Sequence, residues 1–167
     1  MDARILRTPP QSGDFEEHRF DAYGECTWVK FEDHTGLEFC GVFGGGIGNR
    51  SSLARLGDRA FVISAGQGYI VDIRSRSLVH QTKSDDLVAV ASAGRCGRFA
   101  AHDLIKFFVY DNGLIWASKR ISADGIIIDE VRDDVVFGKV FDFEDWVGFS
   151  LDLATFEYEC DWQCPVT

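Results

Sequence analysis

Apolar residues recur along the chain in short runs of about five to eight residues, and Gly, Asp, Asn and Ser separate the runs. The runs are rich in β-branched and aromatic types, and many alternate apolar with polar positions. This pattern is typical of β-strands. The strands that it predicts are 26–32, 37–43, 61–65, 68–73, 78–82, 87–93, 98–102, 105–110, 114–121, 125–131, 134–141, 146–153 and 155–160.

The breaks between the runs carry turn residues. Asn112-Gly113 predicts a tight hairpin, because these two residue types accept the positive φ angles that such a turn needs. Asp124-Gly125 and Asp133-Asp134 predict two further turns. Helical periodicity is nearly absent, and only 14–23 and 51–56 leave room for a short helix. We therefore expect an all-β fold with at most one or two short helices.

Strands at this spacing suit an antiparallel β-sandwich or an incomplete propeller-like stack of short strands. Residues 87–121 read like one four-stranded propeller blade. A closed propeller needs at least four blades of about forty residues, so a chain of 167 residues has room for about three and a half. We expect a flexible N-terminal arm over 1–14 and a single all-β domain over 15–167.

Five segments resemble a group of small, uncharacterised bacterial proteins with propeller-like β-repeats, over about 26–158. They are Trp28-Val29-Lys30-Phe31, 41–46 (GVFGGG), 66–72 (GQGYIVD), 121–126 (ISADGI) and 149–153 (FSLDL). The resemblance implies a fold and no activity. That group usually has a Thr-Gly turn after the last Leu-Asp-Leu strand, and this chain has Ala154-Thr155-Phe156 there, so we expect a differently shaped final hairpin.

No run reaches the roughly 18 apolar residues of a membrane span, and the N-terminus lacks the apolar core of a signal peptide, so we expect a cytoplasmic protein. Five cysteines without paired C-x-x-C spacing indicate reduced, packed thiols. Cys160 and Cys164 would pair only in an oxidising compartment. Arg95 and Arg98 flank Cys96, and such cations lower the pKa of a thiol.

Recognisable catalytic or metal-binding patterns are missing from the sequence. The glycine-rich stretch 44–52 suggests a turn or an anion-binding loop, but it matches neither the Walker nor the dinucleotide pattern. His102-Asp103 has no further histidine at ligand spacing, and there is no G-x-S-x-G elbow. We predict no catalytic residue, no metal and no cofactor. A hydrolase or small-ligand-binding protein using Asp129, Asp142 or His102 in a cleft between sheets stays open as an alternative.

Acidic residues are concentrated in the last part of the chain. Residues 121–167 hold twelve Asp and Glu against two Lys and Arg, which accounts for the whole net charge of −10. Such a field repels nucleic acids and anionic membranes, so we expect neither as a partner. It can instead steer a basic protein surface to a docking site.

Strand alternation places an aromatic residue among these acids. In 146–153 the apolar set is Val147, Phe149, Leu151 and Leu153, which leaves Trp146 on the polar face near Asp142. In 155–162 the acids Glu157, Glu159 and Asp161 share one face. An aromatic anchor with a charged surround has the composition of a binding hot spot. Trp28, beside Lys30 and Glu32, follows the same pattern, and cover by a loop is the alternative for both tryptophans.

These observations favour a non-enzymatic protein-binding module, most concretely an immunity protein or inhibitor that masks a basic toxin or enzyme. A structural part of a larger β-assembly, joined through its sheet edges, is a further alternative. The predicted partner-binding residues are Asp129, Glu130, Asp133, Asp134, Asp142, Glu144, Asp145, Trp146, Glu157 and Glu159.

Overall fold

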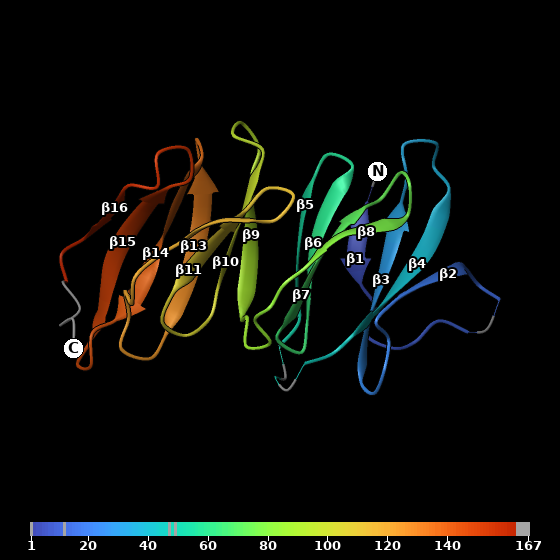
Figure 1. The fold of residues 1–167 in the computed structure, drawn as a ribbon, viewed down its shortest axis with the longest axis horizontal. Coiled ribbons are helices and arrows are strands. Elements are labelled where there is room, and N and C mark those ends of the chain that lie inside the picture. The colour runs from blue at the N-terminus through green and yellow to red at the C-terminus, as the bar shows by residue number, and fades with distance from the viewer. Residues whose placement is uncertain (1, 12, 47, 49, 163–167) are drawn as a thin grey trace. The chain divides into compact units, whose positions relative to one another are not determined.

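A computed structural model describes residues 2–11, 13–46, 48 and 50–162 of the chain. Within these residues there are sixteen β-strands and no helix, so the predicted all-β fold is confirmed. The strands form four sheets of four strands each (Figure 1). We expected one domain over 15–167, and the chain divides into two compact units, Met1–Leu87 and Val88–Thr167.

The first unit contains two sheets. Its strands are β1 (Ala3–Ile5), β2 (Glu16–Phe20), β3 (Cys26–Glu32), β4 (Glu38–Gly44), β5 (Ser52–Leu56), β6 (Arg59–Ser64), β7 (Gln67–Asp72) and β8 (Ser77–Gln81). The sheet orders are β1-β3-β4-β2 and β5-β6-β7-β8. Neighbouring strands are antiparallel except for β2 and β4, which are parallel. Phe31, Phe39, Phe43 and Tyr69 lie in the core of this unit.

Part of the segment expected to be a flexible arm is an ordered strand. Residues Ala3–Ile5 pair with β3, and the backbone bonds Leu6 N to Trp28 O (2.8 Å) and Glu32 N to Asp2 O (2.9 Å) extend this pairing. The edge of β3 offers N–H and C=O groups that need partners, and a short segment with little pattern of its own can supply them. These residues thus form a paired strand within the segment expected to be an arm.

The two places considered for a short helix are strands as well. β2 occupies the first of them and pairs with β4, where the Phe20 and Phe43 rings stack at 4.9 Å. β5 occupies the second and pairs with β6. In both places a neighbouring strand edge decided the conformation, because a short helix has little stability of its own.

The second unit also contains two sheets, β12-β11-β10-β9 and β13-β14-β15-β16. Its strands are β9 (Ala89–Ala93), β10 (Arg98–His102), β11 (Phe107–Tyr110), β12 (Leu114–Ala117), β13 (Ile126–Arg132), β14 (Val135–Phe141), β15 (Trp146–Asp152) and β16 (Tyr158–Cys160). The first sheet is the blade predicted from 87–121. Four such sheets fit where we expected three and a half, and two of the four are kept short by two-residue turns such as Asp133-Asp134.

The core of the second unit lies between its two sheets. Phe107 from β11 meets Phe149 from β15 at a ring distance of 5.3 Å, and Val109, Val136 and Leu151 are fully buried around them. Burying one such side chain stabilises a fold by about 1.5–3 kcal/mol. The alternation predicted for β15 is confirmed, because its apolar set points inward while the Trp146 side chain remains 43% exposed.

Candidate functional site

Two acidic turns of the sheet β13–β16 lie at opposite ends of its strand β14. The β13–β14 turn carries Asp133 and Asp134, and the β14–β15 turn carries Asp142, Glu144 and Asp145. The seven residues of β14 separate the two turns. At about 3.3 Å per residue, this strand holds them roughly 20 Å apart. The predicted residues of these two turns therefore form two separate groups and not one surface.

In the β13–β14 turn the acids are paired with an arginine of the same unit. Asp133 and Asp134 have φ angles of 51° and 68°, as a two-residue hairpin turn requires. An Arg95 guanidinium nitrogen lies 2.6 Å from an Asp133 carboxylate oxygen, and the Arg95 N–H donates to Asp134 Oδ1 at 3.0 Å. These contacts join the β9–β10 turn to the β13–β14 turn. Asp133 and Asp134 therefore stabilise the contact between these two turns.

Asp129 and Glu130 lie on β13, an edge strand of the sheet. The pairing of β13 with β14 shifts register between Ile128 and Glu130, which leaves Asp129 as the extra residue of a β-bulge. Glu130 also lies 3.5 Å from Arg132. A bulge and charged residues on an edge strand hinder its pairing with other chains. This position suits protection of the edge as well as contact with a partner.

Glu157 and Glu159 are exposed, and Tyr158 and Cys160 between and beside them point toward the core, as the alternation predicted. Glu159 borders an open groove of about 340 Å³ on the face of β15 and β16. Gly148, Ser150 and Asp161 are among its other lining residues. The groove adds an acidic depression to this edge of the sheet.

The β14–β15 turn is built by its own carboxylates. Asp142 Oδ1 accepts the N–H groups of Glu144 (2.9 Å) and Asp145 (2.7 Å), and these bonds lower the pKa of Asp142 below its ordinary value. Asp145 Oδ1 accepts the Trp146 N–H at 2.7 Å. Two of the predicted acids thus hold the turn in shape, and the residues between them face solvent.

Phe143 stands at the tip of this turn and was not among the predicted residues. Its side chain is 65% exposed, and its φ angle is +86°, a conformation that costs a non-glycine residue about 1–3 kcal/mol. The Trp162 ring lies edge-on at 6.4 Å. A sequence signal existed, since Phe143 stands within the acidic stretch 142–145, but the residues alone did not show which way it points.

Trp146 is covered on one side and open on the other. Its ring lies 5.6 Å from the Phe141 ring, and its indole rests against Gly125, where a Cβ atom would come within 2.8 Å of it. The remaining 43% of the side chain is exposed. The two interpretations of Trp146 therefore both hold in part: the indole is anchored on its own unit and still presents a surface.

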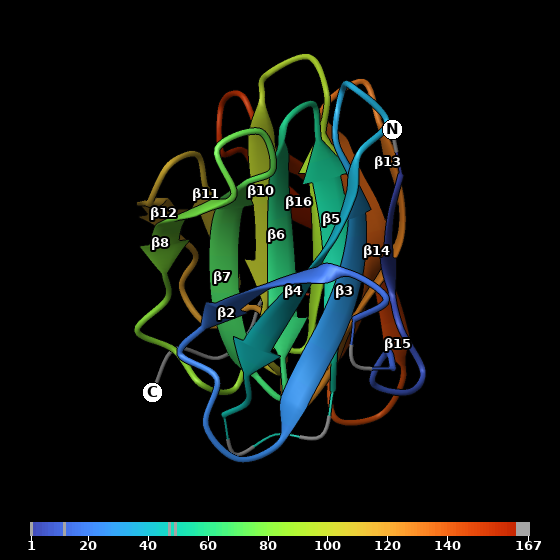
Figure 2. The same ribbon diagram turned by 90° about the vertical axis from the view of Figure 1, so that its right-hand side faces the viewer.

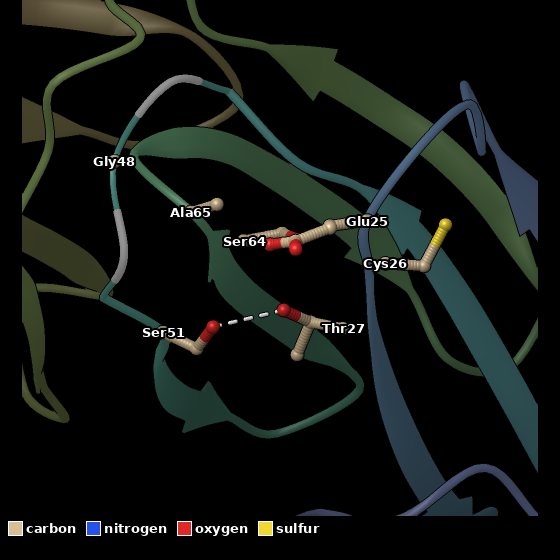
Figure 3. A pocket seen from close by; sticks show the side chains of 7 residues that line it. All are labelled: Glu25, Cys26, Thr27, Gly48, Ser51, Ser64 and Ala65. Atoms are coloured by element: carbon tan, nitrogen blue, oxygen red, sulfur yellow. Dashed lines mark hydrogen bonds between the residues drawn. The ribbon is translucent and has the colours of Figure 1, made fainter.

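The glycine-rich stretch borders a small cavity of about 180 Å³ in the first unit (Figure 3). The cavity is lined by Glu25, Cys26, Thr27, Gly48, Ser51, Ser64 and Ala65. The N–H groups of Gly45, Gly46 and Gly48 donate to the carbonyl oxygens of Glu25, Ser64 and Ala65. An anion-binding loop needs such groups directed at the ligand, so these contacts favour the turn interpretation. Ile47 and Asn49 lie outside the described residues.

The sequence also suggested chemistry at Cys96, at His102-Asp103 and at Cys160. Burial, followed by the Asp134 charge, raises the pKa of Cys96, so the two flanking arginines do not lower it below its ordinary value. The buried His102 ring places Nδ1 2.6 Å from the Asp103 carbonyl oxygen, and the Asp103 carboxylate accepts the N–H of Ile105 at 2.6 Å. Cys160 is a free thiol, and Cys164 lies outside the described residues.

In the part of the chain that the structure describes, no group of three or more His, Cys, Asp or Glu side chains could hold a metal ion. The same residues include no helix long and apolar enough to cross a membrane.

No family model and no curated protein matches the chain. Among solved structures, the computationally designed Ika4 protein is similar with a TM-score of 0.55 and 13% sequence identity, over 69% of this chain and 72% of the other. Kuenenia stuttgartiensis hydrazine synthase gives a TM-score of 0.53 at 12% identity, over 93% and 51%. The designed Ika8 protein gives 0.55 at 11%, over 83% and 46%.

This chain thus spans about half the length of the hydrazine synthase and Ika8 chains that it matches. The likenesses concern the fold alone, which is all-β with small, propeller-like sheets of four strands.

Proposed function

We propose that the protein is a non-enzymatic binding module that docks a basic protein surface through the tip of the β14–β15 turn. The tip consists of Phe143, Glu144, Asp145 and Trp146. The observation that carries the proposal is the joint exposure of two aromatic side chains, 65% for Phe143 and 43% for Trp146, with carboxylates between them. Most exposed residues of a folded domain lack such a combination, and binding hot spots are rich in it.

The chemistry of the tip matches arginine and lysine. An aromatic face attracts a guanidinium or ammonium group, and this contact contributes roughly 0.5–2 kcal/mol. Adjacent carboxylates form charge-assisted hydrogen bonds with the same groups. The twelve acidic residues of 121–167 supply a long-range field that raises the association rate with a cationic partner.

The remaining predicted residues divide into supporting and peripheral ones. Asp142 acts as a positioning residue, since its carboxylate holds the N–H groups of Glu144 and Asp145. Asp133 is paired with Arg95 and contributes little net charge to a partner. The most concrete form of the proposal is an immunity protein or inhibitor. In that form the tip enters the substrate cleft of a basic toxin or enzyme and blocks it.

A capture experiment with matched variants tests the proposal. Immobilised wild type, Trp146→Ala, Glu144→Gln and the control Glu157→Gln are incubated with lysate of the source cell, and bound proteins are identified. We expect a basic protein that wild type and Glu157→Gln retain alike. Trp146→Ala should bind it at least about 30-fold more weakly, as for a hot-spot residue, and Glu144→Gln several-fold more weakly. Circular dichroism confirms that each variant is folded.

Two results would overturn the proposal. One is that no basic protein distinguishes wild type from Trp146→Ala. The other concerns the inhibitor form alone: a captured enzyme that keeps its full activity when saturated with this protein is not masked by it.

A further inference from the structure

The outer face of the sheet β13–β16 carries partly exposed apolar side chains next to the tip of the β14–β15 turn. Trp146, the first residue of β15, pairs with Phe141 of the neighbouring strand β14 (Figure 2). Ile127 of β13 pairs with Lys139, two residues before Phe141, and therefore lies on the same face. The side chains of Trp146 and Ile127 are each 43% exposed, and Phe141 is half-buried. The aromatic surface of the tip thus continues onto the sheet.

Gly148, two residues after Trp146 on this face, has no packing reason in the described chain. A Cβ atom added at Gly148 would meet no atom within 4 Å. At Gly138 of β14, by contrast, it would collide with the Ile127 carbonyl oxygen, so the fold itself requires that glycine. Glycine inside a strand weakens the strand, and it often marks a place where a ligand or another backbone approaches closely. The bare backbone at Gly148 leaves room for such an approach.

Two carboxylates stand beside this bare backbone. Glu159 and Asp161 line the same open groove of about 340 Å³ as Gly148. Glu159 is exposed and lies opposite Ser150 in the pairing of β15 with β16. Among the described residues, neither carboxylate forms an ion pair with a Lys or Arg side chain. The groove is therefore complementary in charge to a basic segment, and a bound cation would not have to displace one of the protein's own.

The same face already binds one guanidinium group. Arg132 places its guanidinium carbon 5.0 Å from the centre of the Phe137 ring and a guanidinium nitrogen 3.5 Å from a Glu130 carboxylate oxygen. Phe137 lies opposite Ser150, which lines the groove. Aromatic faces and carboxylates both attract guanidinium groups. The contact of Arg132 shows that this surface provides the two together, one strand away from the groove.

We propose that an extended, basic segment of the partner protein lies in this groove, with its backbone over Gly148 and an arginine or lysine side chain between Glu159 and Asp161. This inference rests on the proposed function, because it concerns the same basic partner, and it adds a contact beyond the tip. A second copy of this chain would bring the same acids to the groove and be repelled. Lys139, which pairs with Gly148 across the strands, is exposed and lowers the affinity for a basic segment.

Binding of a hexa-arginine peptide to the full chain tests the proposal before any partner is known. Shifts of the amide signals in the magnetic resonance spectrum of the isotope-labelled protein locate the peptide. We expect shifts at Gly148, Ser150 and Glu159 as well as at the tip. Both sets should weaken with added salt, because salt screens exposed charges.

Two variants should change the affinity for this peptide in opposite directions. Gly148→Thr fills the groove and should bind about fivefold more weakly, while its urea midpoint equals or exceeds that of wild type because threonine favours a strand. Lys139→Gln removes a like charge and should bind about twofold more tightly, a gain that a damaged fold cannot give. The matched control Lys83→Gln, in the first unit, changes the net charge equally and should bind like wild type.

The outcomes separate the groove contact from the proposed function. Shifts confined to 143–146, or a Gly148→Thr variant that binds like wild type, overturn the groove contact and leave the tip intact. Shifts in the groove combined with unchanged binding by Trp146→Ala support the groove contact and overturn the tip. A peptide that shifts neither region overturns both. A Lys139→Gln variant that binds no more tightly than Lys83→Gln also overturns the groove contact.

Discussion

The two turns at opposite ends of β14 are both acidic and have different surroundings. At the β13–β14 turn, Arg95 neutralises Asp133 and binds Asp134 through its backbone. At the β14–β15 turn, the carboxylates of Asp142 and Asp145 bond to backbone N–H groups of the turn itself, and Phe143 and Trp146 are exposed above them. The comparison shows that a count of acids does not define a binding surface. What else each carboxylate contacts decides whether it is available to a partner.

Among the variants that keep Trp146, the largest effect should follow a change beneath its indole. In Gly125→Ala the new methyl group would lie 2.8 Å from the indole, which must move outward from its place against the sheet. We expect partner affinity to fall about tenfold, or 1.4 kcal/mol, with little loss of stability because the displaced ring is at the surface. Tryptophan fluorescence reports the displacement, and titration with the captured partner reports the affinity. If the indole is displaced and the affinity is unchanged, the orientation of Trp146 does not matter for partner binding.

A change at the tip, Phe143→Gly, should have a smaller effect on partner affinity, and it should make the fold more stable. Phe143→Gly removes the cost of a positive φ angle and should raise the free energy of unfolding by about 1 kcal/mol. The same variant should bind the partner several-fold more weakly, since an exposed aromatic ring is lost. Asp134→Gly, at φ 68° in the other turn, relieves the same cost but also removes the acceptor of the Arg95 N–H, so it should gain less stability. Urea denaturation measures the stability of both variants. A Phe143→Gly variant that is less stable than wild type would mean that Phe143 stabilises the fold.

At the β13–β14 turn, Arg95→Ala should change little. The Arg95–Asp133 pair is exposed, 75% and 61% for the two side chains, so its loss should cost no more than about 0.5 kcal/mol. Partner affinity should change less than twofold, because this turn is not the proposed contact. An effect of Arg95→Ala on capture as large as that of Trp146→Ala would break the distinction between the two turns.

The smallest expected effect is a loss of stability at acidic pH. The backbone hydrogen bonds of Asp142 lower its pKa in the folded state, and those of Asp152 with Thr155 and Ala154 do the same at the β15–β16 turn. A lowered folded pKa stabilises the fold above the unfolded value of about 3.9 and loses that stabilisation as the pH falls through the folded pKa. Urea midpoints should therefore fall below about pH 4, and less steeply in Asp142→Asn. Equal slopes for the variant and wild type would contradict this role.

Local patterns were sufficient where each residue's environment depends on its immediate neighbours. The alternation of Val147, Phe149 and Leu151 predicted which face of β15 is buried, and Asp133-Asp134 predicted a turn. They were insufficient for β1 and β2, which form because strand edges distant in sequence accept them, and for β5, which pairs with the strand that follows it. They were also insufficient for the pKa of Cys96, since adjacent arginines suggested a lowered value and burial raises it.

By itself, the sequence determined an all-β chain of short strands, a four-stranded unit within 87–121, an acidic C-terminal part and an outward Trp146. These follow from strand alternation and residue chemistry, which act over a few neighbouring positions. Only the tertiary structure decided that the two acidic turns lie at opposite ends of β14 and that Arg95 pairs with Asp133 in one of them. It also decided that Phe143 and β12 are exposed. Those facts depend on contacts between residues far apart in the chain, and such contacts leave no periodic trace in the order of amino acids.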